Sequence, residues 1–245
     1  MDDTTADLRK ELYANYGRDF QGAGEELDLD GAERWGRAYD WYFRGWLPDD
    51  RDAPIADLAC GSGGLLLFFK QRGYRTLAGC DISPDQIGRA RRIGFTVERA
   101  EVLDWLAGHE DRFALITALD LIEHLTRSEA LRFLELARSA LRAGGRLILQ
   151  TPNAAAPCGM DYRYNDMTHE WCYNPNQLER LLRRAGFGGI VFREQGPVPW
   201  GYSATSTLRW LVWKLLSAGV QLWWLAETGR TAPVLSKNLI VCAIR

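Results

Sequence analysis

The sequence predicts an α/β fold with a mostly parallel sheet that carries helices on both faces. From residue 55 onward, short apolar segments alternate with amphipathic segments of helical length, which is typical of parallel strands joined by helical crossovers. The strand segments are apolar nearly throughout, as expected of strands buried on both faces. A chain of 245 residues is long enough for one large domain of this class.

Seven segments are predicted strands, and helices are predicted in four of the gaps between them. The strands are expected, in chain order, at PIADLA, TLAGCD, FTVERA, FALITALD, RLILQTP, GGIVFRE and NLIVCAI. The helices are expected at GGLLLFFKQRG, SPDQIGRARRIG, RSEALRFLELARSALRAGG and NPNQLERLLRRAGF. Ser83 and Pro84 suit the N-cap and first position of the second helix, and Gly144 is expected to close the third. Two further amphipathic helices are predicted over residues 5–20 and 31–47.

These elements divide the chain into four parts. Residues 1–50 form a helical N-terminal cap, 51–195 the core, 196–236 an insertion, and 237–245 the last strand of the core. The insertion is much longer than a hairpin needs, and it holds five of the ten tryptophans. We therefore expect it to be a helical element with a function of its own.

The charge and the cysteines limit the class of partner and the compartment. A net charge of −2 argues against a dedicated nucleic-acid binder. Residues 171–245 carry nine Lys/Arg against three Asp/Glu, so an anionic partner is expected there. The five cysteines show no C-x-x-C spacing, and no apolar leader is visible. We therefore expect free thiols and a cytoplasmic location.

The stretch DLACGSGG, residues 57–64, predicts a ligand-binding turn after the first strand. Gly61 and Gly63 would let backbone N–H groups approach a ligand closely. Asp57 would repel a pyrophosphate but suits a cationic group. Asp81 ends the second strand, where a carboxylate can accept from both ribose hydroxyls, and Glu101 follows the third strand, where an acid can accept from an adenine amino group. A ribose, an adenine and a cation together describe S-adenosyl-L-methionine (SAM).

The motifs IADLACGSGG, GCDISPDQIGRAR, VERAEVLDW, ALITALDLIEHL and LILQTPN resemble, in this order and spacing, those of class I SAM-dependent methyltransferases. The resemblance covers roughly residues 50–193 and the last strand. It implies a Rossmann-like, seven-stranded sheet whose last strand is antiparallel. The segment DLIEHL resembles the corresponding motif in the branch of this family that includes the ubiquinone-type O-methyltransferases. The segment from TPN to RRAGF resembles methyltransferases of bacterial polysaccharide and glycolipid pathways, which implies a sugar hydroxyl as acceptor.

The resemblance also assigns roles to individual residues around the cofactor. Asp57 would lie near the methionine amino group, and Ala59 replaces the usual glycine of the turn. Leu119 would face the sulfonium through its carbonyl. The complete cofactor set is Asp57, Ala59, Gly61, Gly63, Asp81, Ile82, Glu101, Val102, Leu119 and Asp120.

The polar segment DYRYNDMTHEW, residues 161–171, is expected to stand over the transferred methyl group. An alcohol acceptor must lose a proton, so a general base helps the transfer. His169 is either that base or a residue that shapes the pocket. Asp166 and His124 complete the catalytic candidates, and the alternative for His124 is a structural role in helix packing or next to the cofactor. Asp161, Asp166 and His169 together fit no specific metal motif, so no metal site is predicted.

The predicted function is O-methylation of a sugar or glycan hydroxyl, with SAM as methyl donor. The alternatives are an O- or N-methyltransferase of a small aromatic, natural-product or quinone-like lipid acceptor, and a SAM-binding scaffold without catalysis. The insertion 196–236 is interpreted as a lid, as an interfacial helix that reaches a lipid-linked acceptor at the inner face of the membrane, or as a homodimer contact. Its uncharged run is too short for a bilayer span.

Overall fold

The computed structural model describes residues 12, 29–157, 159–199, 202–232 and 234–245. The helix predicted over residues 5–20 lies outside these ranges except for residue 12. The second predicted helix is α3 (Leu29–Tyr42). It ends before the predicted residue 47, because the chain turns at Phe43–Trp46 and Gly45 takes a φ of 72°.

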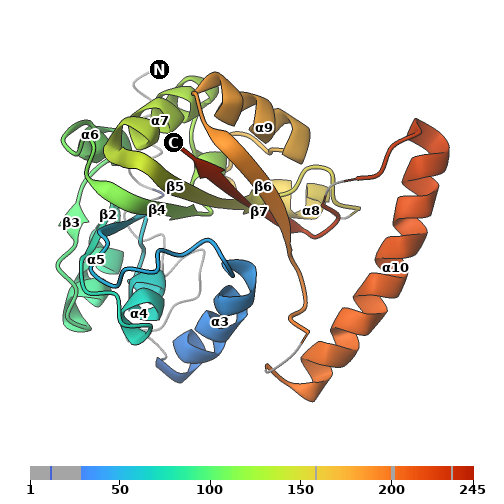
Figure 1. Cartoon of the computed structure of the whole chain (residues 1–245), viewed down its shortest axis with the longest axis horizontal. Helices are drawn as coiled ribbons and strands as arrows, with labels where there is room; N and C mark the ends of the chain where they lie inside the picture. Colours follow the sequence, from blue (N-terminus) through green and yellow to red (C-terminus); the bar gives the residue numbers. More distant parts are fainter. Residues whose placement is uncertain (1–11, 13–28, 158, 200–201, 233) are drawn as a thin grey trace.

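A seven-stranded sheet in the order β3-β2-β1-β4-β5-β7-β6 forms the centre of the molecule (Figure 1). All strand pairs are parallel except those of β7, which runs antiparallel to both β5 and β6. This confirms the predicted Rossmann-like fold and its antiparallel last strand. The strands are β1 (Ile55–Leu58), β2 (Leu77–Asp81), β3 (Glu98–Arg99), β4 (Phe113–Leu119), β5 (Leu141–Pro152), β6 (Gly188–Gln195) and β7 (Asn238–Ile244).

Helices cover both faces of the sheet (Figure 1). One face packs against α3, α4 (Gly64–Gln71) and α5 (Pro84–Arg92), and the other against α6 (Val102–Ala107), α7 (Arg127–Ala140) and α9 (Pro175–Arg184). Helix α4 buries Leu65, Leu66, Phe68 and Phe69, and each such side chain contributes about 1.5–3 kcal/mol when fully buried. The two short elements η1 (Ile122–His124) and α8 (Gly159–Tyr164) follow β4 and β5.

Helix α7 shows how local sequence sets an element's start and how tertiary contacts set its end. Thr126 and Glu129 form a reciprocal capping box at its N-terminus, which satisfies two backbone donors that would otherwise be orphaned. The helix ends at Ala140 and not at the predicted Gly144, because Leu141 already pairs with Phe113 of β4. Gly144 takes a φ of 74° at the irregularity in the β4–β5 pairing between Leu141 and Arg146.

The insertion contains one long helix, α10 (Ala204–Thr228), which stands beside the body of the molecule (Figure 1). The chain leaves the sheet after Gln195, at the end of β6, and returns to it at Asn238, at the start of β7. These two residues pair with each other. Asn238 also pairs with Pro152 at the end of β5. Both ends of the insertion therefore lie at the side of the sheet that holds the carboxyl ends of the parallel strands. No helix in the described part of the chain is both long enough and apolar enough to cross a membrane.

Candidate active site

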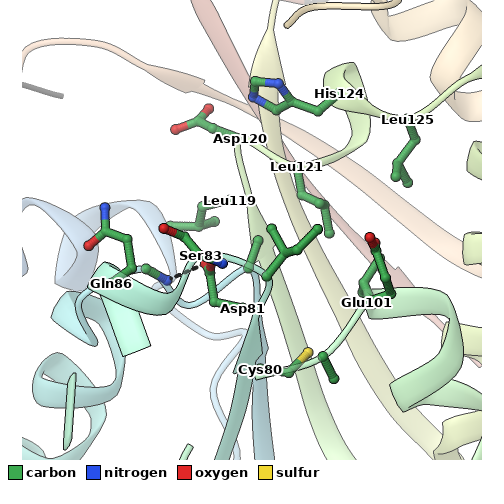
Figure 2. Close-up of a pocket in the computed structure, with 15 residues that line it drawn as sticks. Cys80, Asp81, Ser83, Gln86, Glu101, Leu119, Asp120, Leu121, His124 and Leu125 are labelled. Atoms are coloured by element: carbon green, nitrogen blue, oxygen red, sulfur yellow. Dashed lines mark hydrogen bonds between the residues drawn. The ribbon is translucent and has the colours of Figure 1, made fainter. Parts of the chain in front are cut away.

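A cavity of about 180 Å³ lies at the carboxyl ends of the strands, where open α/β sheets bind their ligands (Figure 2). The residues that line it come from the ends of β2 and β4, from the segments that follow β1, β2, β3 and β4, and from the first turns of α5 and α6. They are Ala59, Gly61, Cys80, Asp81, Ile82, Ser83, Gln86, Ala100, Glu101, Val102, Leu119, Asp120, Leu121, His124 and Leu125.

The turn after β1 presents backbone to this cavity. Ala59 and Gly61 both take a φ of 52°, a left-handed conformation that glycine adopts easily and alanine does not. Gly63, with a φ of 85°, precedes the first turn of α4. A Cβ at Gly63 would lie 3.2 Å from the Phe95 ring. Gly63 is not among the residues that line the cavity, and the close approach to Phe95 fits a role in the packing of α4, so its predicted cofactor contact stays a prediction.

Asp57 lies behind this turn and not in the wall of the cavity. It is 3% exposed, and its Oδ1 accepts a hydrogen bond of 2.7 Å from the Thr117 hydroxyl. Burial raises the pKa of Asp57 to about 7, with a further increase from Asp81, while the Thr117 hydrogen bond lowers it. The Asp57 side chain does not line the cavity, and its place near the methionine amino group stays a prediction.

Asp81 lines the cavity, but its carboxylate also organises the loop around it. Oδ2 accepts from the Gly61 N–H at 2.9 Å, and Oδ1 accepts from the Ser83 N–H at 2.8 Å. Burial raises the pKa of Asp81, although these backbone hydrogen bonds oppose the increase. The side chain thus joins the ends of β1 and β2 across the site, a role that the sequence pattern did not indicate.

The remaining predicted cofactor residues lie in the cavity wall. Ile82, Glu101 and Val102 line it together with Cys80 and Ala100, two residues that sequence reasoning missed because they carry no distinctive chemistry. Leu119 and Asp120 lie at the end of β4, on the opposite side from Glu101 (Figure 2). The structure therefore brings eight of the ten predicted cofactor residues to one cavity, and their individual roles stay predictions.

A network of hydrogen bonds through the buried Gln150 holds the Asp120 carboxylate in place. The Gln150 amide donates to Asp120 Oδ2 at 2.8 Å, and the Tyr39 hydroxyl donates to Gln150 Oε1 at 2.7 Å. Gln195 also donates to Gln150 Oε1 at 2.8 Å. Burial raises the pKa of Asp120 to about 6, while the Gln150 hydrogen bond and Lys237 oppose the increase. Tyr39, Gln150 and Gln195 were missed because they lie far apart in sequence.

The predicted catalytic residues His124 and His169 lie next to each other. Their ring centroids are 4.8 Å apart, although 45 positions separate them in the sequence. His124 is 7% exposed and lines the cavity beside Asp120 (Figure 2), and His169 is half-buried. Asp166 accepts a 2.6 Å hydrogen bond from the Thr168 hydroxyl, whose oxygen lies 2.8 Å from His124 Nδ1. Asp166 thus reaches His124 through Thr168.

Comparison with known proteins defines the class to which this fold and cavity belong. Residues 32–190 match the profile of a family described as a methyltransferase domain, and the chain therefore belongs to this methyltransferase family. The enzyme is a transferase that uses SAM as its cofactor. A search of curated proteins finds no match.

Solved structures of SAM-dependent methyltransferases share the fold over nearly the whole chain. The Archaeoglobus fulgidus enzyme is 17% identical, with a TM-score of 0.63 over 96% of this chain and 99% of its own. A Mesorhizobium loti enzyme is 20% identical, with a TM-score of 0.58 over 89% and 100% of the two chains. A Haemonchus contortus phosphoethanolamine N-methyltransferase bound to SAM is 12% identical, with a TM-score of 0.58 over 95% of this chain and 60% of its own.

Proposed function

We propose that this enzyme transfers the methyl group of SAM to a hydroxyl oxygen of a sugar or glycan. The observation that carries the proposal is the group of proton-accepting side chains at one end of the cavity, formed by Asp120, His124 and His169. A hydroxyl must lose its proton as the methyl group arrives, and a side chain positioned nearby can accelerate that step. The Asp120 carboxylate lies in the cavity wall beside His124, where it can accept a proton.

The cofactor would occupy the part of the cavity between the glycine turn and the loop after β3. Its adenine would lie against Ile82, Glu101 and Val102, and its ribose would lie near Asp81. In this pose the sulfonium would lie toward Leu119 and Asp120, next to the two histidines. The chain's own contribution is to hold the acceptor oxygen in line with the S–CH₃ bond, to exclude water and to take up the proton.

The test separates cofactor binding from turnover. Purified enzyme is supplied with SAM and with panels of sugar nucleotides, glycolipid extracts, phenols and amines, and S-adenosylhomocysteine release is measured. We expect release with the sugar acceptors, and His169→Ala should abolish it while calorimetry still detects SAM binding. Release with phenols or amines alone would refute the sugar assignment. SAM binding without turnover on any acceptor would indicate a scaffold.

The outer face of α10 supports a lipid-linked form of this acceptor. The helix turns its polar groups inward: Ser206 and Ser217 are buried, and Gln221 hydrogen-bonds both backbone groups of Ala232. Its outer side chains are apolar and exposed, with Leu215 at 75% and Leu222 at 68%. The other exposed members of this outer face are Leu208, Leu211, Val212, Leu216, Trp223 and Leu225.

The shape and charge of this outer face favour a membrane surface over a second copy of the chain. At about 100° per residue, the apolar side chains span about half of the helix circumference, whereas a coiled-coil seam is narrower. Arg209 falls at one margin of the arc, where it could meet anionic headgroups, and Lys214 at the other margin forms an ion pair with Glu194. No described residue of the insertion lines the cavity, so α10 would bring the active-site edge to the membrane without covering the cofactor.

Flotation with vesicles of anionic and of zwitterionic phospholipid tests this part of the proposal. We expect the enzyme to float with anionic vesicles. Leu215→Glu combined with Leu222→Glu should abolish flotation and leave SAM binding intact, and Lys70→Glu, a charge change on another surface, is the matched control. Failure to float, or a concentration-dependent dimer that the double variant disrupts, would refute the membrane assignment.

A further inference from the structure

Three side chains with metal-ligating atoms meet beside the end of the cavity that Asp120 and His124 line, which we call the acceptor end. Glu123, His124 and His169 each bring one ligand atom into a space where all of these atoms lie within 4.8 Å of one another. Glu123 and His124 are consecutive residues of η1, and His169 lies in the segment between α8 and α9. The backbone ties the two segments together, because the carbonyl of Glu123 accepts from the N–H groups of Glu170 and Trp171.

Glu123 is a buried carboxylate with one unpartnered oxygen. The residue is 1% exposed. Its Oε2 accepts a hydrogen bond of 2.9 Å from Thr151, whereas its Oε1 has no hydrogen-bond partner. A buried carboxylate oxygen without a partner is costly, and a cation would satisfy it.

The hydrogen bonds of His124 prepare this residue to act as a ligand. Its Nδ1 lies 3.3 Å from the carbonyl oxygen of Thr168, which can only accept a hydrogen bond. Nδ1 also lies 2.8 Å from the Thr168 hydroxyl, whose own proton is directed to Asp166. Both contacts require the proton of a neutral His124 to be on Nδ1. The Nε2 atom then carries the lone pair that a metal needs. The contacts of Nδ1 with Thr168 fix the orientation of the imidazole ring, as hydrogen bonds to the second ring nitrogen do in known metal sites.

We propose that Glu123, His124 and His169 bind a divalent transition-metal ion at the acceptor end of the cavity. One carboxylate and two imidazoles form a mixed oxygen and nitrogen donor set. This set suits Zn²⁺ or Mn²⁺ better than it suits Mg²⁺ or Ca²⁺, which prefer sites made of oxygen ligands alone. Sequence reasoning grouped His169 with Asp161 and Asp166 instead. In the structure Asp161 is exposed, and Asp166 holds Thr168 in place.

The role of this ion rests on the proposed function, although its binding does not. Three protein ligands leave coordination positions open, and the ion could polarise an acceptor hydroxyl there and lower its pKa. The proton would pass to the Asp120 carboxylate. The oxygen then forms a bond to the methyl carbon as the S–CH₃ bond breaks, and S-adenosylhomocysteine leaves. In this arrangement His124 and His169 act as ligands and Asp120 acts as the base.

Metal binding is measured directly on the full-length enzyme after dialysis against a chelator. Free Mn²⁺ is counted by electron paramagnetic resonance during a titration, and Zn²⁺ is then added as a competitor. We expect one Mn²⁺ per chain, displaced by Zn²⁺. Glu123→Gln and His169→Ala should each weaken binding by about tenfold or more. The control is His109→Ala, because His109 stacks on Trp105 away from this cluster.

Two results would overturn the metal site: a wild-type enzyme that binds neither ion, or variants that bind as tightly as the wild type. If Glu123→Gln does not fold, His169→Ala decides alone, because that side chain is only half-buried. Calorimetry with SAM separates the two proposals. SAM binding without metal binding refutes only the metal site, and metal binding without SAM binding leaves the site standing while the proposed function fails.

Discussion

The buried carboxylate of Asp57 predicts a pH-dependent loss of stability that an isosteric substitution should remove. Its pKa is raised from 3.8 to about 7, chiefly because it is buried. Between these two values the folded chain holds a proton that the unfolded chain has lost, so the free energy of unfolding falls as the pH rises. Above about pH 7 both states are ionised, and the whole cost of burying the charge is present.

The magnitude follows from the size of the shift. From about pH 5 to about pH 8 the cost grows by about 3 kcal/mol at 1.36 kcal/mol per pKa unit, and we expect about 2 kcal/mol after relaxation of the folded state. Asp57→Asn carries no charge at any pH, and its amide oxygen can still accept from Thr117. The variant should therefore gain about 2 kcal/mol relative to the wild type between these two pH values, whatever its stability at the lower one.

Urea unfolding of the two cofactor-free proteins at about pH 5 and about pH 8 measures this difference. Asp52→Asn is the matched control, because Asp52 is exposed and its hydrogen bond to Arg75 lowers its pKa. That variant should lose stability relative to the wild type, or stay level with it, over the same range. An Asp57→Asn difference that does not change with pH would show that the buried charge is already compensated in the folded state.

Three further substitutions test local parts of the fold. Thr126→Ala removes the capping box of α7 and should lower the free energy of unfolding in urea by about 1 kcal/mol. Gly63→Ala places a Cβ at a φ of 85°, 3.2 Å from Phe95, so it should cost more than about 1 kcal/mol in the same assay; an unchanged midpoint would contradict the packing role. Gln150→Leu removes the amide that donates a hydrogen bond to Asp120 and the oxygen that accepts one from the Tyr39 hydroxyl. It should cost about 2 kcal/mol and raise the apparent pKa of any turnover that depends on Asp120, which a pH–rate profile would reveal.

The order of elements and much of the cofactor cavity could be predicted from the sequence. The apolar strand segments and their caps are local signals, and DLACGSGG, Asp81 and Glu101 each follow a strand whose carboxyl end had to lie at the same edge of the sheet. Eight of the ten predicted cofactor residues therefore line one cavity. The resemblance to methyltransferases was confirmed at the level of the family, and the finer acceptor assignments stay predictions.

Tertiary structure alone decided which distant side chains meet and which groups face away. A sequence pattern cannot show that Asp57 turns toward Thr117, that Gln150 bridges Tyr39 and Asp120, or that Glu123 and His124 approach His169, because these contacts depend on how β4, β5 and their loops pack in three dimensions. The same limit applies to α10. Its composition revealed an amphipathic helix, but only its hydrogen bonds to Glu194, Val198 and Ala232 showed that the polar side faces the protein and the apolar side faces outward.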